Sequence, residues 1–332
     1  MMPARRVVCI MRVGAAGALF GAVATFCFAQ SVNHLADPPQ PAPSRWAADV
    51  ARIDDQLRLR ALAVDDPRGH WVAGHFDTTD IASQVRHYAA ARIAAPRENL
   101  YLASLAVACQ RPVSPTLPEC DTVDRLADWA SRDVDNGAPL LLLAARASKR
   151  GNNEATVAYL EQAAARPALD DYRPRGALEF WEYVMAFPVD ANRAAKAEAA
   201  AVYAAAQPTA ALTALLGICT AAPGLPESRR TACAKAGGAL AERGSTTLAR
   251  SVGAGIAERM AQDSTAAERA RANRVAVQVL VTRCGADEQA ILQDAEAADA
   301  AVRARAVDAW DRSVRAKASL GEIAACERRP GR

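Results

Sequence analysis

Histidines and acids gather in one short stretch of this 332-residue sequence, where they could bind a metal ion. His70, His75 and His87 fall within eighteen residues, with Asp77 and Asp80 between them. Such side chains ligate transition metals when a fold turns them towards one point. However, His70 and His75 lack the i, i+4 spacing of one helix face, and no His-Glu-x-x-His motif is present. We therefore expect three unrelated histidines and predict no metal ligand.

A carboxylate pair, Glu179 and Glu182, flanks Trp181 and is the second candidate for chemistry. Glycosidases use paired carboxylates for acid–base catalysis. Residues three apart lie on one helix face, however, so this pair would not straddle a sugar. The sequence also lacks a Gly-x-Ser-x-Gly elbow, a glycine-rich phosphate loop and a dinucleotide fingerprint. We predict no catalytic residue and no cofactor; a cell-envelope hydrolase using Glu179 or a histidine-bound metal is the alternative.

The densest aromatic cluster surrounds these acids and comprises Tyr172, Phe180, Trp181, Tyr183 and Phe187. Phe180, Trp181 and Tyr183 cannot share one helix face, so at least one must point out of the core. Core packing with one residue at the rim is one interpretation. The functional interpretation is a wall of a ligand or peptide groove, formed by Tyr172, Trp181 and Tyr183.

Helices must position all of these residues, because alanine, the strongest helix former, is abundant and alternating β-branched runs are absent. The sequence predicts an all-α protein. Its clearest unit spans residues 135–167. There, Leu140–Ala147 is apolar on every side and predicts a buried helix. Gly151 should end that helix in a left-handed conformation, and Asn153 should cap the next one.

This unit resembles one tetratricopeptide (TPR) repeat on the residues that occupy the fixed offsets of that motif, which are Leu143, Ala144, Gly151, Leu160 and Ala163. It departs from the motif at Leu140, where Trp is preferred, and at Thr156, where Ala is preferred. The resemblance implies stacked antiparallel helical hairpins, as a TPR-like α-solenoid or an irregular helical array. An ordinary hairpin in a non-repeat α protein is the alternative.

The N-terminal 29 residues have the features of a secretory signal peptide. A basic start precedes the apolar run Val13–Phe28, and Cys27 and Ala29 place small side chains where a signal peptidase would cut after Ala29. We expect a mature N-terminus at Gln30 and a periplasmic or secreted protein; an uncleaved membrane anchor is the alternative. Cleavage removes three arginines and no acid, which leaves 37 basic and 37 acidic side chains. This balance argues against a nucleic-acid partner, and no transmembrane segment is expected after cleavage.

Six cysteines remain in the predicted mature chain, and an even number in an exported protein indicates disulfides. Sequential pairing fits best, because each pair brackets a predicted turn or hairpin. The predicted bonds are Cys109–Cys120, Cys219–Cys233 and Cys284–Cys326. Reduced structural cysteines are the alternative, and the absence of Cys-x-x-Cys argues against a redox or zinc-ribbon motif.

The mature chain is expected to comprise a proline-rich tether (30–43), an N-terminal helical region (44–188) and a C-terminal helical region (189–332), unless both regions form one continuous solenoid. We expect a loop over residues 68–80, with at most one short helical turn in it. A capping box starting at Thr265 should precede a central, buried helix that contains Val275 and Val279.

Curved helical stacks offer grooves for peptides. The leading functional hypothesis is therefore an interaction module of the cell envelope that binds a protein or peptide partner. On this hypothesis, Leu143→Asp should disrupt folding far more than Glu179→Ala or His75→Ala, whose side chains are expected at the surface.

Overall fold

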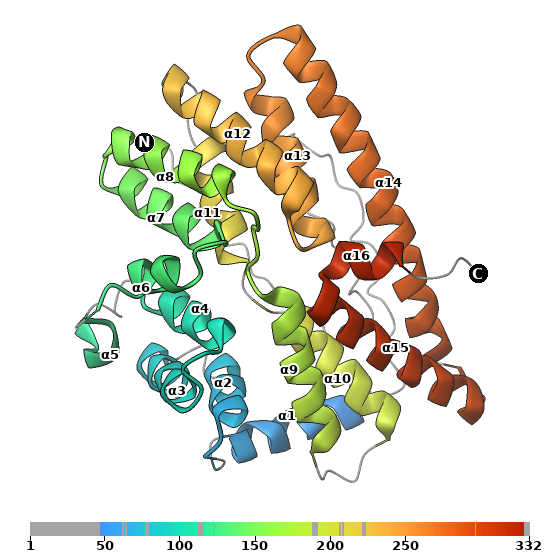
Figure 1. Cartoon of the computed structure of the whole chain (residues 1–332). Helices are drawn as coiled ribbons and strands as arrows, with labels where there is room; N and C mark the ends of the chain where they lie inside the picture. The colour runs from blue at the N-terminus through green and yellow to red at the C-terminus, as the bar shows by residue number, and fades with distance from the viewer. Residues whose placement is uncertain are drawn as a thin grey trace, which may run out of the picture.

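A computed structural model describes residues 47–328, except 62, 64, 77–79, 112–115, 122, 188–191, 206, 208, 221–223 and 296. The predicted signal peptide, the cleavage site before Gln30 and the proline-rich tether lie outside the described residues. Within them the fold is all-α, and helices pack against one another with no β-strand (Figure 1). This confirms the predicted fold class.

The helices follow one another through short connections. The first half of the chain contains α1 (Ala47–Ala61), α2 (Pro67–Phe76), α3 (Ile81–Ala94), α4 (Asn99–Ala108), α5 (Pro118–Asp121), α6 (Arg125–Arg132), α7 (Ala138–Lys149), α8 (Asn153–Ala165) and α9 (Arg173–Ala186). The second half contains α10 (Arg193–Ala205), α11 (Ala210–Thr220), α12 (Glu227–Arg243), α13 (Thr247–Met260), α14 (Ser264–Ala295), α15 (Ala300–Leu320) and α16 (Glu322–Glu327).

Helices α7 and α8 form the hairpin predicted over residues 135–167. Leu140–Ala144 is buried as expected, and Gly151 ends the first helix with a φ of 72°. The cap of α8 is Asn152 rather than Asn153, because the Asn152 side chain accepts a hydrogen bond from the Ala155 amide at 3.0 Å. The geometry is that of a helical hairpin; membership of the TPR family stays a prediction.

The loop expected over residues 68–80 is wrong for most of its length, because α2 occupies Pro67–Phe76. Asp66 starts this helix by accepting a hydrogen bond from the Gly69 amide at 2.8 Å. Burial then stabilises it, since Trp71 and Val72 are fully buried. Gly74 lets the Tyr88 ring pack closely, because a Cβ there would lie 2.5 Å from that ring. Gly74 thus permits close packing of a helix where we expected a loop.

Helix α9 lies beside helices that are far from it in sequence. It packs with α1, α10 and α15 around a common core, and Figure 1 shows α15 running beside α9. That core joins Ile53 and Leu57 of α1 to Trp181 of α9 and Val307 of α15. Pro188, the predicted boundary, lies outside the described residues, and hydrophobic packing extends across its position in the sequence.

Helices α12 and α13 cross closely at glycine. A Cβ on Gly253 would lie 2.4 Å from the Ala241 amide nitrogen, whereas one on Gly255 would meet nothing within 4 Å, so Gly253 permits the close approach and Gly255 does not contribute to it. Helix α14 is not buried on every side as we expected, because Val275 and Val279 are 58% and 65% exposed, although Val277 on its other face is buried. It begins at Ser264, with Asp263 accepting from the Ala266 amide at 2.7 Å in place of the predicted Thr265 box.

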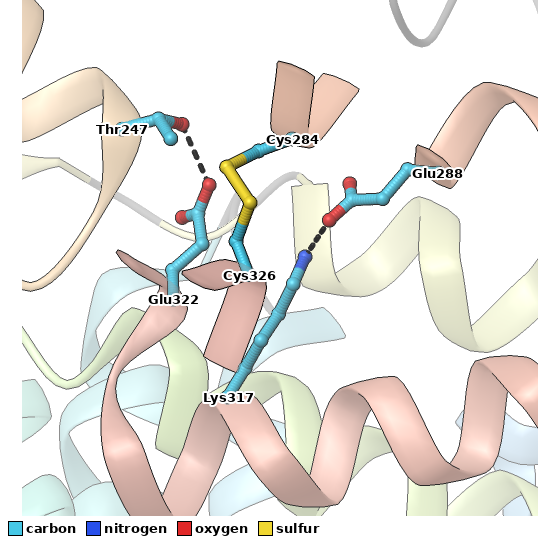
Figure 2. Close-up of a disulfide and its surroundings, with 6 residues drawn as sticks. All are labelled: Thr247, Cys284, Glu288, Lys317, Glu322 and Cys326. Carbon is cyan, nitrogen blue, oxygen red and sulfur yellow. Dashed lines mark hydrogen bonds and ion pairs between the residues drawn. A yellow bond between two sulfur atoms is a disulfide. The ribbon is translucent and has the colours of Figure 1, made fainter. Parts of the chain in front are cut away.

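The six cysteines form the three predicted disulfides, Cys109–Cys120, Cys219–Cys233 and Cys284–Cys326. The third joins α14 to α16 at the C-terminus (Figure 2). Beside it, Thr247 donates to Glu322 at 2.6 Å, and Lys317 pairs with Glu288 (Figure 2). Disulfides persist in oxidising compartments, which is weak support for an extracellular or periplasmic location.

One stretch of the described chain, Arg193–Thr220, is long and apolar enough to cross a membrane by length and composition alone. It comprises α10 and α11, which are separate helices here, and core helices of soluble proteins pass the same test.

Candidate functional site

The aromatic side chains of α9 point in different directions. Trp181 is 2% exposed and its indole N–H donates to Asp311 on α15 at 2.6 Å, so it belongs to the core rather than to a groove wall. Tyr172 precedes α9 with a φ of 60°, and its hydroxyl donates to Asp133. Tyr183 is half-buried and lines an open groove. Of the three predicted groove residues, only Tyr183 contributes to that groove.

This groove lies between the start of α2, the start of α4 and α9, and encloses about 630 Å³. Its floor is an ion-pair network centred on Glu179, whose side chain is 3% exposed. Arg68 contacts Glu179 at 2.6 Å and Glu182 at 2.7 Å. Arg175 reaches the other Glu179 oxygen at 3.0 Å. We name these residues, together with Tyr101, Tyr183 and Phe187, the α9 groove.

Glu179 is therefore a structural anion and not the surface residue that the sequence suggested. Both of its carboxylate oxygens are taken by arginines. Glu182 is likewise shared, between Arg68 and Arg315 of α15 at 2.7 Å. Both carboxylates are thus held in place by permanently charged guanidinium groups. The hydrolase alternative stays a prediction.

The three histidines divide into two environments. His70 and His87 lie with their Nδ1 atoms 3.3 Å apart, and His70 Nε2 is 3.0 Å from an Asp65 oxygen. His75 points elsewhere, against the rings of Trp71 and Phe180. Burial lowers the pKa of His75 to about 4, and its hydrogen bond to the Trp71 carbonyl opposes that shift only partly. His75 is thus neutral at physiological pH.

These histidines form no three-residue metal cluster within the part of the chain that the structure describes. Asp77, one of the acids considered as a ligand, lies outside that part. Asp80 accepts a hydrogen bond from the Ser83 amide at 3.0 Å and caps α3.

A second hollow lies inside the molecule, where α2, α3, α4, α6, α7, α9, α10 and α11 meet. It encloses about 210 Å³, and we call it the aromatic cavity. Its rings are those of Trp71, Tyr88, Trp129, Phe180 and Tyr203. Arg111 is the one exposed residue of the lining that the structure describes.

Most polar groups of the aromatic cavity have partners. The Trp71 indole donates to Ser104 at 2.9 Å, Ser104 donates to the Leu100 carbonyl, and Gln84 donates to the Gly74 carbonyl at 2.8 Å. Such pairing is normal, because a buried polar group without a hydrogen bond costs stability.

Asp171 and Gln207 are different. Asp171 Oδ1 accepts from the Arg173 amide at 3.3 Å, but Oδ2 is inaccessible to solvent and has no partner among the described residues. The amide nitrogen of Gln207 is likewise buried without a partner among them. Burial, reinforced by the charge of Asp170, raises the pKa of Asp171 to about 6.

Sequence reasoning missed the aromatic cavity. Asp171 belongs to the motif Asp-Asp-Tyr-Arg-Pro, which reads as a turn, and turns usually expose their acids. Gln207 lies between two alanine-rich helices, with no pattern around it. The only signal was the cluster of aromatic residues near α9, of which Phe180 is the member that lines the cavity.

Comparison with known proteins finds no match. No protein-family model, no curated protein and no solved structure matches this chain.

Proposed function

We propose that this protein is an interaction module of the cell envelope that binds a protein or peptide segment in the α9 groove. The observation that carries this proposal is the groove itself: about 630 Å³, open, and walled by fixed charges and aromatic side chains. Peptide-binding grooves combine such features, since aromatic side chains supply contact area and ordered charges set orientation.

The charges of the α9 groove are preorganised for binding. Arg68 and Arg175 are each held by two acids, so their guanidinium groups keep one position before a partner arrives. Each still has N–H groups for a peptide carbonyl, because a guanidinium carries five donors. Preorganisation lowers the entropy cost of binding. Tyr183, which is half-buried, adds apolar surface beside these charges, whereas Tyr101 and Phe187 line the groove but are themselves buried.

Site-specific photo-crosslinking in the native envelope tests this proposal. Benzoylphenylalanine replaces Ala186, an exposed residue of the groove, or Val279, an exposed residue of α14 outside it. The proposal predicts an adduct of one defined protein or peptide from position 186 and none from position 279. Adding Arg175→Glu should remove that adduct. No adduct at 186, or equal adducts at both positions, contradicts the proposal.

A further inference from the structure

The aromatic cavity combines two features that a protein core normally avoids together. It is hollow, whereas cores are close-packed with few voids larger than a water molecule. It also leaves a carboxylate oxygen and an amide N–H buried without partners among the described residues. Each feature costs stability in the empty protein, and one bound molecule would relieve both.

We propose that the aromatic cavity is a binding site for a small organic ammonium compound with an aromatic or aliphatic body. Asp171 would accept the ammonium N–H, and the cavity rings would surround the body. This site is distinct from the α9 groove and does not depend on the interaction proposed there.

Charge decides the class of ligand. Asp171 Oδ2 is an acceptor facing no donor, so the group that satisfies it must donate. A cation donates most strongly, because a hydrogen bond between charged groups is worth about twice a neutral one. The rings of Trp71, Trp129 and Phe180 add to this preference, since aromatic faces attract cations. The amide of Gln207 then accommodates an acceptor, such as a hydroxyl oxygen, on the same ligand.

Size limits the ligand further. A cavity of about 210 Å³ is smaller than the roughly 300–1,000 Å³ of sites for drug-sized molecules. It therefore suits a compound of about ten non-hydrogen atoms, and not a peptide. A folded protein segment could reach it only with a single side chain.

The other charged groups around the cavity do not replace the ligand. Arg173 lowers the pKa of Asp171, but its guanidinium donates to the Ala205 carbonyl at 3.0 Å. Asp170 has the opposite effect on that pKa and accepts from Ser245 at 2.8 Å. Across the cavity, His75 is neutral, and burial raises the pKa of Tyr88, so it is neutral as well. Tyr203 and Arg111 complete the titratable lining.

Calorimetric titration of the full mature chain with three matched probes tests the proposal. The probes are 2-phenylethylamine, which is cationic, 2-phenylethanol, which is neutral, and 3-phenylpropionate, which is anionic. We expect the amine to bind saturably to one site. The alcohol should bind at least about tenfold more weakly than the amine. The anion should not bind. If water alone fills the cavity, the amine should not bind at millimolar concentration. That result overturns the proposal.

Variants locate the binding. Asp171→Asn keeps the acceptor for the Arg173 amide and removes the charge. It should weaken amine binding about tenfold to a hundredfold and change 2-phenylethanol binding much less, because a neutral hydroxyl makes the weaker hydrogen bond. Asp308→Asn, which alters an exposed ion pair with Arg193, is the control and should change neither. Unchanged amine affinity in Asp171→Asn contradicts the proposal.

A pH series on the unmodified protein covers the case in which the Asp171 variant fails to fold. Amine affinity should fall as the pH is lowered through about 6, because Asp171 then becomes protonated. Binding of 2-phenylethanol should not follow that curve, and His75 stays neutral over this range. Amine affinity that is flat between pH 7.5 and 5 contradicts the proposal.

Discussion

The α9 groove and the aromatic cavity share one helix but treat buried charge in opposite ways. In the groove, Glu179 is buried and each of its oxygens has an arginine. In the cavity, the Oδ2 atom of Asp171 is buried and has no partner among the described residues. A charge that the fold satisfies by itself is structural, whereas a charge that it leaves unsatisfied calls for a molecule from outside. Carboxylates that look alike in sequence thus have different roles.

The largest expected loss of stability comes from a substitution in α7, the helix that supports one wall of the aromatic cavity. Leu142 of α7 lines the cavity, and its neighbour Leu143 is 4% exposed within the main core. Leu143→Asp places an unpaired charge there, so we expect loss of cooperative folding, a cost of about 4 kcal/mol or more. Circular dichroism melting measures it. Val279→Asp, at a 65% exposed site, is the control, and equal destabilisation by both variants would show that α7 is not the core helix described.

Removal of the C-terminal disulfide should affect binding in the α9 groove but not binding in the aromatic cavity. Cys284–Cys326 closes a 42-residue separation, so replacing both residues by Ser should cost about 4 kcal/mol. The bond fastens the end of α15, which supplies Arg315 to Glu182 in the groove network, whereas α14–α16 supply nothing to the cavity lining. We expect weaker crosslinking from the α9 groove in the double variant and unchanged binding of 2-phenylethylamine. Loss of amine binding would show that the two regions are coupled.

Asp171 itself should make the empty protein less stable as pH rises. Its folded-state pKa is about 6, against 3.8 for the ordinary carboxyl, so the unfolded chain releases this proton first. Its contribution to stability is present below pH 4 and is lost as the pH rises through 6, by about 3 kcal/mol in total. Asp171→Asn should therefore stabilise the protein by about that amount at pH 7.5 and not at pH 3.5. Denaturant unfolding at both pH values measures the difference; a variant that is destabilised at pH 7.5 contradicts it.

Substitution of Glu179 should lower the unfolding free energy, whereas substitution of Asp171 raises it, and the change should be smaller. Glu179→Gln removes the charge that Arg68 and Arg175 share, but each arginine keeps a second acid, Glu182 or Glu98. We expect a loss of about 2 kcal/mol in unfolding free energy, measured by urea denaturation. Glu161→Gln, in an exposed pair with Lys235, should cost less than about 1 kcal/mol. Equal effects of the two substitutions would place Glu179 among ordinary surface charges.

How much could be predicted from the sequence depended on the range of the interactions. The α7–α8 hairpin rests on local spacing, and the disulfides join cysteines that follow one another in the sequence, so both were predicted correctly. Helix α2 was missed because its stability comes from burying Trp71 against distant helices, which no local pattern reveals. The sequence did not predict the groove network or the aromatic cavity for the same reason. Arg68 pairs with Glu179, which is 111 residues away in the sequence, and the packing of α9 against α10 brings Gln207 and Asp171 to the same cavity.

The most direct test of the contrast between satisfied and unsatisfied charge is the pKa of the Asp171 carboxyl, measured by carbon-13 NMR with Asp171→Asn to assign its signal. The account predicts titration near pH 6 in the free protein, and a clear downward shift of that pKa when 2-phenylethylamine saturates the cavity. Titration near the ordinary value of 3.8 that the amine leaves unchanged would contradict it.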